Sequence, residues 1–201
     1  MKTRNSKNSL LRHGFKANAE RIASSYREAL SLKATDPLCA FELARHLAIT
    51  VRTPLDVGLS ENEARILTRP TSGWSGLRLI TEEDNHLIIY NDAQSSGRQQ
   101  STVMHELAHI ICEHELPEAR IVSGHPLALR SYDPAMEREA ECLGSTLQLP
   151  RVGLLWALKR KMKIREIAEH FLASEDMVNY RVNTTGVKKQ LALARAYSNK
   201  R

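Results

Sequence analysis

Apolar residues recur at helical spacing along most of this 201-residue chain. Ile22, Tyr26 and Leu30 lie four positions apart, which predicts a helix over about 17–33. A second periodic stretch, 98–114, is apolar on nearly every side, which predicts a central buried helix. The remaining helical patterns lie toward the C-terminus, over 152–161, 164–171, 175–184 and 187–197.

Capping signals indicate where further helices begin. Aspartate followed by proline combines a capping carboxylate with a preformed first turn, so the Asp-Pro pairs at 36–37 and 133–134 each predict a helix start. The second of these helices is expected to end near Leu149. Ser60, with Glu63 three residues later, predicts a capping box that opens a short helix.

Between residues 70 and 97 the pattern changes from helical to strand-like. The apolar runs at 77–80 and 86–90 predict two strands joined by the acidic turn at 82–85. We therefore predict an α+β fold, mostly helical, with a small antiparallel sheet of two or three strands.

Charge divides the chain into three parts. Residues 1–33 carry a balance of +6, residues 34–150 a balance of −8, and residues 151–201 a balance of +8. We predict a basic N-terminal arm and helix, a central domain, and a basic helical C-terminal region packed on that domain. The acidic centre suits a cation, and the basic ends suit an acidic partner or nucleic acid, although basic helices are often simply solvated.

Apolar run lengths and cysteine usage indicate the cellular compartment in which the protein is expected to work. No apolar run approaches the ~18 residues needed to cross a bilayer, so no membrane partner is expected. The polar N-terminus does not resemble a signal peptide. Cys39, Cys112 and Cys142 are odd in number, widely spaced and set among apolar residues. They predict reduced thiols in a cytoplasmic protein rather than a disulfide framework or a cysteine zinc site.

The segment 105–109, His-Glu-Leu-Ala-His, carries the most specific chemistry in the chain. Two imidazoles four residues apart share one helix face, so His105 and His109 can both bind a single zinc ion. Glu106 lies beside that ion and can accept a proton from water. Buried polar groups without partners cost several kcal/mol, and a metal would supply the partners here.

A catalytic zinc site usually has three protein ligands and one exchangeable water. The helix that begins at 133–134 carries three glutamates. Glu137 and Glu141 share a face, and Gly144 continues that stripe and allows another helix to approach closely; Glu139 points elsewhere. Such acids alone would indicate a solvated helix face, but beside a buried His-Glu-x-x-His helix they predict a ligand.

Four ordered features extend this pattern. The run 98–114 resembles the active-site helix of the ImmA/IrrE metallopeptidase family. Segments 74–76 and 88–91 resemble the strand region that precedes that helix. The run 137–150 resembles the family's acidic third-ligand helix, with its leucine-rich end and proline. Together they are more specific than the pentapeptide alone, and the resemblance covers roughly residues 37–186.

The resemblance implies roles for the downstream glutamates. By position, Glu137 is the third zinc ligand and Glu141 accepts a hydrogen bond from a zinc-bound imidazole, with Glu139 as the alternative ligand. Two departures from the family pattern lie on the same helix. Leu143-Gly144 replaces the usual aromatic-alanine pair, and Glu141 stands where asparagine or aspartate is usual.

The resemblance further implies a zincin-like fold holding one Zn²⁺ ion and acting as a cytoplasmic endopeptidase. The expected substrate is a regulatory protein, typically a helix-turn-helix repressor of a stress response or mobile element. A donor for the developing oxyanion is also needed. His125 and Tyr132, in the connection between the ligand helices, are the candidates; the alternative for His125 is an ordinary loop histidine.

An alternative function rests on the C-terminal region. Residues 164–184 have the rhythm of a helix-turn-helix, with Ser174 as the cap of the second helix and a basic surrounding composition. This favours a non-proteolytic DNA-binding or repressor-docking regulator with a structural zinc site. In the family that the chain resembles, such tails are implied to pack or to dock substrate, which makes DNA binding the second hypothesis.

Overall fold

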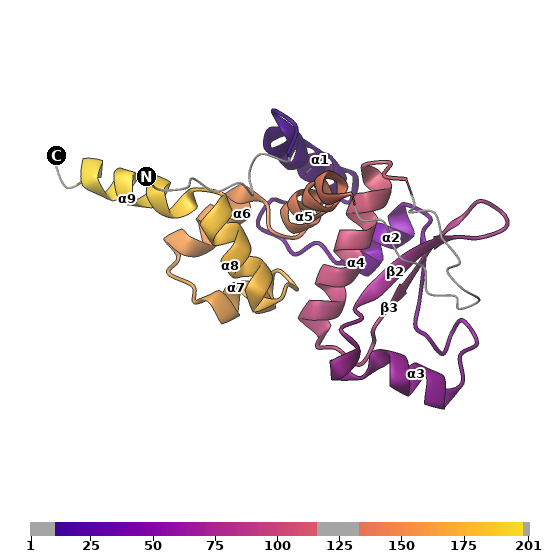
Figure 1. The fold of residues 1–201 in the computed structure, drawn as a ribbon. Helices are drawn as coiled ribbons and strands as arrows, with labels where there is room; N and C mark the ends of the chain where they lie inside the picture. Colours follow the sequence, from indigo (N-terminus) through magenta and orange to yellow (C-terminus); the bar gives the residue numbers. More distant parts are fainter. Residues whose placement is uncertain (1–10, 116–132, 199–201) are drawn as a thin grey trace, which may run out of the picture.

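The computed structural model describes residues 11–115 and 133–198, and every structural statement below refers to these parts of the chain. The helices are α1 (Phe15–Ala29), α2 (Ala40–His46), α3 (Glu61–Thr68), α4 (Ser96–Ile111), α5 (Pro134–Gln148), α6 (Arg151–Lys159), α7 (Ile164–His170), α8 (Glu175–Thr184) and α9 (Val187–Ser198), with a short 3-10 turn, η2 (Pro70–Ser72). The fold is α+β: α2 and α4 lie against one small sheet, and α6–α9 form a second group on the far side of α4 and α5 (Figure 1).

The sheet is mixed, with the strand order β1-β3-β2. β2 (Gly76–Ile80) and β3 (His86–Tyr90) form the predicted antiparallel hairpin. β1 (Thr50–Arg52) pairs with β3 in parallel, so the prediction of an antiparallel sheet was wrong for this strand. A hairpin is encoded by its own turn, whereas β1 meets its partner only after α3 and β2 have intervened. A pairing between strands so far apart in the sequence cannot be predicted from the local sequence pattern.

Helix α2 begins three residues later than the Asp-Pro pair at 36–37 predicts. The Asp36 carboxylate accepts a hydrogen bond from the Lys33 N–H at 2.8 Å, so it closes the preceding turn instead. The first N–H of α2, on Ala40, donates to the side-chain oxygen of Gln100 on α4 at 2.7 Å. This helix end is therefore capped by a residue distant in sequence.

The other predicted helix starts are confirmed. Ser60 and Glu63 form a reciprocal capping box at the start of α3. At the start of α5, the Asp133 side chain accepts a hydrogen bond from the Ala135 N–H, and Pro134 occupies the first turn. Ser174 caps α8 in the same manner. Within the described residues, no helix is both long and apolar enough to cross a membrane.

The buried apolar residues form two clusters. Along the chain, the boundary between them falls at the end of α5, where Leu147 belongs to the first cluster and Leu149 to the second. The first packs α4 and α5 against α1, α2 and the sheet, and includes Ile88, Met104 and Leu143 among its fully buried side chains. The second lies within residues 149–187 and joins α6, α7 and α8.

Two buried arginines connect these clusters at the C-terminal end of α5. Arg27 on α1 donates to the carbonyl oxygen of Gln148 at 3.2 Å. Arg181 on α8 donates to the carbonyl oxygen of Leu149 at 2.9 Å and to the carboxylate of Glu20 at 2.7 Å. Positive charge is favourable where the last carbonyls of a helix lack partners. Helix α8 is thus tied to both α1 and the end of α5.

Helices α4 and α5 approach each other closely at Gly144. A Cβ atom at this position would lie 3.1 Å from the carbonyl oxygen of Met104 and 3.2 Å from the Cα of His105. Both atoms belong to a helix backbone, which cannot yield as a flexible side chain would. The structure confirms the predicted close approach, and it places the contact directly beside the first histidine of the motif.

Gly144→Ala is expected to destabilise the protein by about 1–2 kcal/mol. The overpacking cost of about 1–3 kcal/mol exceeds the gain of about 1 kcal/mol in helix propensity. Urea unfolding measures the change, with Ser96→Ala, an exposed substitution in the first turn of α4, as the control. A Gly144→Ala protein more stable than wild type would contradict the tight contact.

Candidate active site

Helix α4 carries two histidines on one face, and α5 brings a glutamate to them. The Nε2 atoms of His105 and His109 are 3.2 Å apart. The two carboxylate oxygens of Glu137 lie 3.3 Å from His105 Nε2 and 3.4 Å from His109 Nε2. When each residue contributes one ligand atom, all three atoms lie within 4.8 Å of one another.

This spacing suits a tetrahedral metal ion. Zinc–nitrogen and zinc–oxygen bonds of about 2.0–2.1 Å place neighbouring ligand atoms about 3.3–3.4 Å apart in a tetrahedron. The two Nε2 atoms, 3.2 Å apart, have nearly that separation, and a different carboxylate oxygen of Glu137 lies 3.3–3.4 Å from each of them. Two imidazoles and one carboxylate are also a ligand set that zinc uses in catalytic sites, where the fourth position stays open. The three residues can therefore hold a metal ion.

His105 and Glu137 shift each other's pKa values toward their charged forms. Hydrogen bonds from His105 and His109 hold the pKa of Glu137 well below its usual range. Burial opposes protonation of His105, yet its hydrogen bond to Glu137 leaves the pKa of His105 raised overall. Glu137 is thus ionised, which is the form that a metal ion requires of a carboxylate ligand.

A hydrogen-bonded chain runs from His109 into the protein. The Nδ1 atoms of His109 and His114 are 3.0 Å apart, and His114 Nε2 lies 3.2 Å from a carboxylate oxygen of Glu139. Arg12 donates two hydrogen bonds of 2.6 Å to Glu139. If His109 binds metal through Nε2, its Nδ1–H donates to His114, and the Nε2–H of His114 donates to Glu139. Burial lowers the pKa of His114, which favours this neutral form.

The two other glutamates of α5 have different surroundings. Glu139, the alternative ligand, is buried and bound by Arg12 and His114. Its carboxylate therefore belongs to the chain of hydrogen bonds that leads from His109, and not to the group around Glu137. Glu141 forms an ion pair with Arg138. The role expected for Glu141, as an acceptor for an imidazole N–H, stays a prediction, since among the described residues the partner of His109 Nδ1 is His114.

Sequence reasoning missed His114 and Arg12. Helix α4 ends at Ile111, and Glu113 has a φ of 55°, which turns the chain so that His114 returns toward His109. Helical spacing does not describe residues beyond such a turn. The one available signal was a third histidine five residues after His109. His125 and Tyr132, the candidates for oxyanion stabilisation, lie outside the described residues.

Two of the three potential ligands, His105 and Glu137, line a cavity of about 700 Å³. Glu106 lines this cavity and is not one of the three grouped ligands, so it is available to act on a bound substrate. Side chains from the start of β2, from α4, from the first turns of α5 and from α8 enclose the space. These include Ser75, Gly76, Thr102, Pro134, Met177 and Tyr180.

The comparisons with known proteins agree with this geometry. The family model described as the IrrE N-terminal-like domain, a peptidase family, matches residues 60–183. The chain belongs to this family. A search of curated proteins found no match. The IrrE N-terminal-like match extends through α8, so that helix and the grouped histidines and glutamate belong to the same family domain. Membership supports a peptidase, and the ligand group supports a metal-dependent one.

Replacing Glu137 and Glu139 separately is expected to identify the third ligand. Glu137→Gln removes the carboxylate that meets both histidines, so the purified protein should lose its zinc. Glu139→Gln leaves the ligand group intact and should retain about one ion per chain. Elemental analysis after gel filtration measures the zinc content. Full zinc occupancy in the Glu137→Gln protein would refute the assignment.

His114→Ala is expected to weaken zinc binding by about 10–100-fold, because residues that orient a ligating histidine contribute on that scale. Competition with a chromophoric chelator measures the affinity. His46→Ala, which removes an exposed histidine far from the ligand group in sequence, is the control. Equal affinities in both variants and in wild type would show that His114 does not position His109.

Proposed function

We propose that the protein is a zinc-dependent endopeptidase that cleaves a regulatory protein, in particular a helix-turn-helix repressor of a stress response or mobile element. One observation supports the catalytic part most directly. His105, His109 and Glu137 place three potential metal-ligand atoms within 4.8 Å of one another, and Glu106 lines the neighbouring cavity without belonging to that group.

The residues suggest how the reaction proceeds. His105, His109 and Glu137 would hold the ion, which when bound supplies Lewis acidity to a water molecule and to the substrate carbonyl. The Glu106 carboxylate accepts a proton from the water while the water oxygen attacks the carbonyl carbon of the peptide bond. Glu106 then delivers that proton to the amine nitrogen as the carbon–nitrogen bond breaks. The products are a carboxylate and a free amine.

The ligand number favours an enzyme over a structural zinc site. Structural sites are generally closed by four protein ligands, whereas catalytic sites have three and an open position. Among the described residues, three potential ligand side chains lie beside a large cavity, as in the second arrangement. The repressor as substrate rests on the family resemblance, in which such peptidases make one or a few cuts in a regulatory target.

The alternative function, DNA binding through α7 and α8, has less support. In a helix-turn-helix the N-terminal residues of the second helix reach the bases. Here the Ser174 N–H, at the start of α8, donates to the Ser101 hydroxyl oxygen on α4 at 3.3 Å. The first turn also carries Glu175 and Asp176, which repel phosphate groups. This end of α8 is better suited to packing beside the active site than to entering a DNA groove.

Glu106→Gln is expected to abolish cleavage while preserving zinc binding. General acid–base catalysis contributes about 10²–10⁴-fold to such reactions, and the amide cannot accept the proton. The protein is co-expressed with candidate helix-turn-helix repressors, and repressor fragments are detected by immunoblotting. Wild type should produce fragments and the zinc-loaded variant none.

A variant with matched size, Glu113→Gln, controls for loss of charge near the end of α4. It should cleave like wild type because Glu113 follows the helix and is exposed. Undiminished cleavage by zinc-loaded Glu106→Gln would refute the proposed mechanism.

A further inference from the structure

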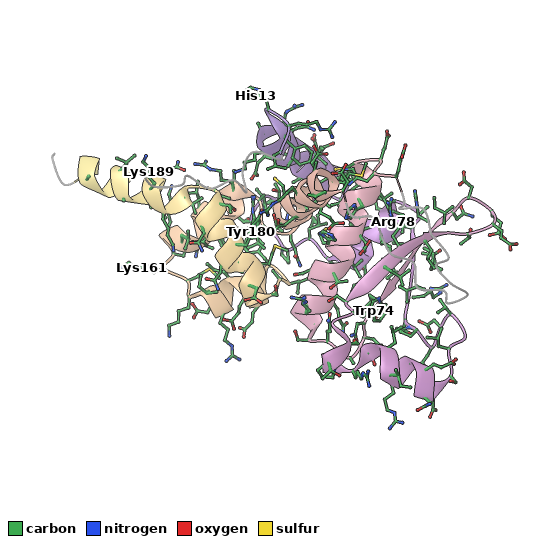
Figure 2. All side chains as sticks on the ribbon, viewed as in Figure 1. His13, Trp74, Arg78, Lys161, Tyr180 and Lys189 are labelled. Carbon is green, nitrogen blue, oxygen red and sulfur yellow. The ribbon has the colours of Figure 1, made fainter. Side chains whose placement is uncertain are left out.

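Helix α8 has two distinct faces. Val178, Arg181 and Val182 are buried on the side that packs into the second hydrophobic cluster and toward α5. Met177 and Tyr180 are half-buried and line the cavity, and Met177 also packs against the edge of the second cluster. In Figure 2 Tyr180 lies between α8 and α5. Ser174 and Asp176, at the start of α8, line the space as well, so Met177 and Tyr180 form the apolar part of the wall that α8 contributes beside Glu106.

This wall is held in place at its start by α4. A Cβ atom at Gly97 would lie 2.5 Å from the carbonyl oxygen of Ala173, so the turn before α8 packs directly on the α4 backbone. The Ser174 N–H donates to the Ser101 hydroxyl oxygen at 3.3 Å. Farther along α8, Arg181 is bound to the end of α5. A wall fixed at both places can discriminate between side chains, because it cannot move aside for a poor fit.

The charged side chains of this cavity would balance once a divalent ion is bound. Two arginines and four carboxylates line it; they are Arg98, Arg138, Glu106, Glu137, Glu141 and Asp176. Burial also raises the pKa of Tyr180 to about 12, which keeps its side chain neutral. Where Met177 and Tyr180 line the cavity, shape and apolar contact are the means of selection that their side chains offer. The volume, about 700 Å³, lies within the ~300–1,000 Å³ of typical ligand sites.

We propose that Met177 and Tyr180 form a specificity subsite that selects substrates with a large apolar side chain beside the peptide bond to be cleaved. This inference rests on the proposed peptidase function. It assigns α8, the second helix of the helix-turn-helix-like pair, to peptide recognition. Leucine, methionine and phenylalanine side chains would lie against Met177 and the Tyr180 ring, whereas alanine would leave that wall exposed to water.

The experiment uses the zinc-loaded full chain and a random decapeptide library, with cleavage positions read by mass spectrometry. Wild type should cut beside large apolar residues. A leucine peptide from the preferred set is then compared with its alanine analogue. In Met177→Ala, the ratio of their kcat/KM values should fall at least about tenfold, because apolar pockets discriminate on this scale.

Two further variants distinguish a subsite from general damage. Asn179→Ala changes an exposed neighbour on α8 that does not line the cavity, and its selectivity should equal that of wild type. Tyr180→Ala removes the ring and should lower the leucine-to-alanine ratio as Met177→Ala does. A wild-type ratio in Tyr180→Ala would contradict the assignment of the ring to the subsite. Thermal unfolding verifies that each variant is folded.

A binding measurement separates this inference from the peptidase proposal. Immobilised, zinc-loaded Glu106→Gln protein captures peptides from the same library. Enrichment of large apolar residues that Met177→Ala removes supports the subsite, even if wild type cleaves no peptide and the proposed function fails. If neither cleavage nor capture distinguishes large apolar residues from alanine, or if Asn179→Ala alters selectivity as much as Met177→Ala, the subsite is refuted.

Discussion

The close packing of α4 against α5 is the constraint on which the rest of the structure depends. His105 and His109 are fixed by their spacing on one helix, but Glu137 reaches them only because α5 lies close beside that helix. The absence of a side chain at Gly144 permits this approach, next to the His105 backbone. If α5 were shifted along α4 by one helical turn, about 5.4 Å, the Glu137 carboxylate would lie too far from the two histidines for the three to bind one ion. The proposed metal site is thus a direct consequence of how two helices meet.

Other parts of the chain hold this helix pair from both sides. Behind it, Arg12 and Glu139 support His114, which contacts His109. In front, α8 closes one side of the cavity and is tied to α1 and the end of α5 by buried Arg181. The N-terminal and C-terminal regions differ from the centre in charge, yet both contribute to the surroundings of the same site. We propose that the first orients a metal ligand and the second selects the substrate.

Local sequence patterns predicted the features that depend on neighbouring residues. Helical spacing placed His105 and His109 on one face, the cap at Asp133 gave the start of α5, and the hairpin was visible from its two apolar runs. Features that depend on distant contacts escaped prediction. The parallel pairing of β1, the cap that Gln100 provides for α2, and the return of His114 after the positive φ of Glu113 are of this kind. The same holds for Met177 and Tyr180, whose spacing on α8 indicates an apolar stripe but not the cavity that it borders.

X-ray absorption at the zinc edge is the sharpest test of the metal site, because it reports the atoms around the ion whether or not the protein cleaves anything. We expect a four-coordinate site with nitrogen and oxygen neighbours at about 2.0–2.1 Å, including the scattering pattern of two imidazoles. Sulfur neighbours at about 2.3 Å would instead indicate binding by cysteines such as Cys112 or Cys142. That result, or a site without imidazole scattering, would contradict the convergence of His105, His109 and Glu137 on one metal ion.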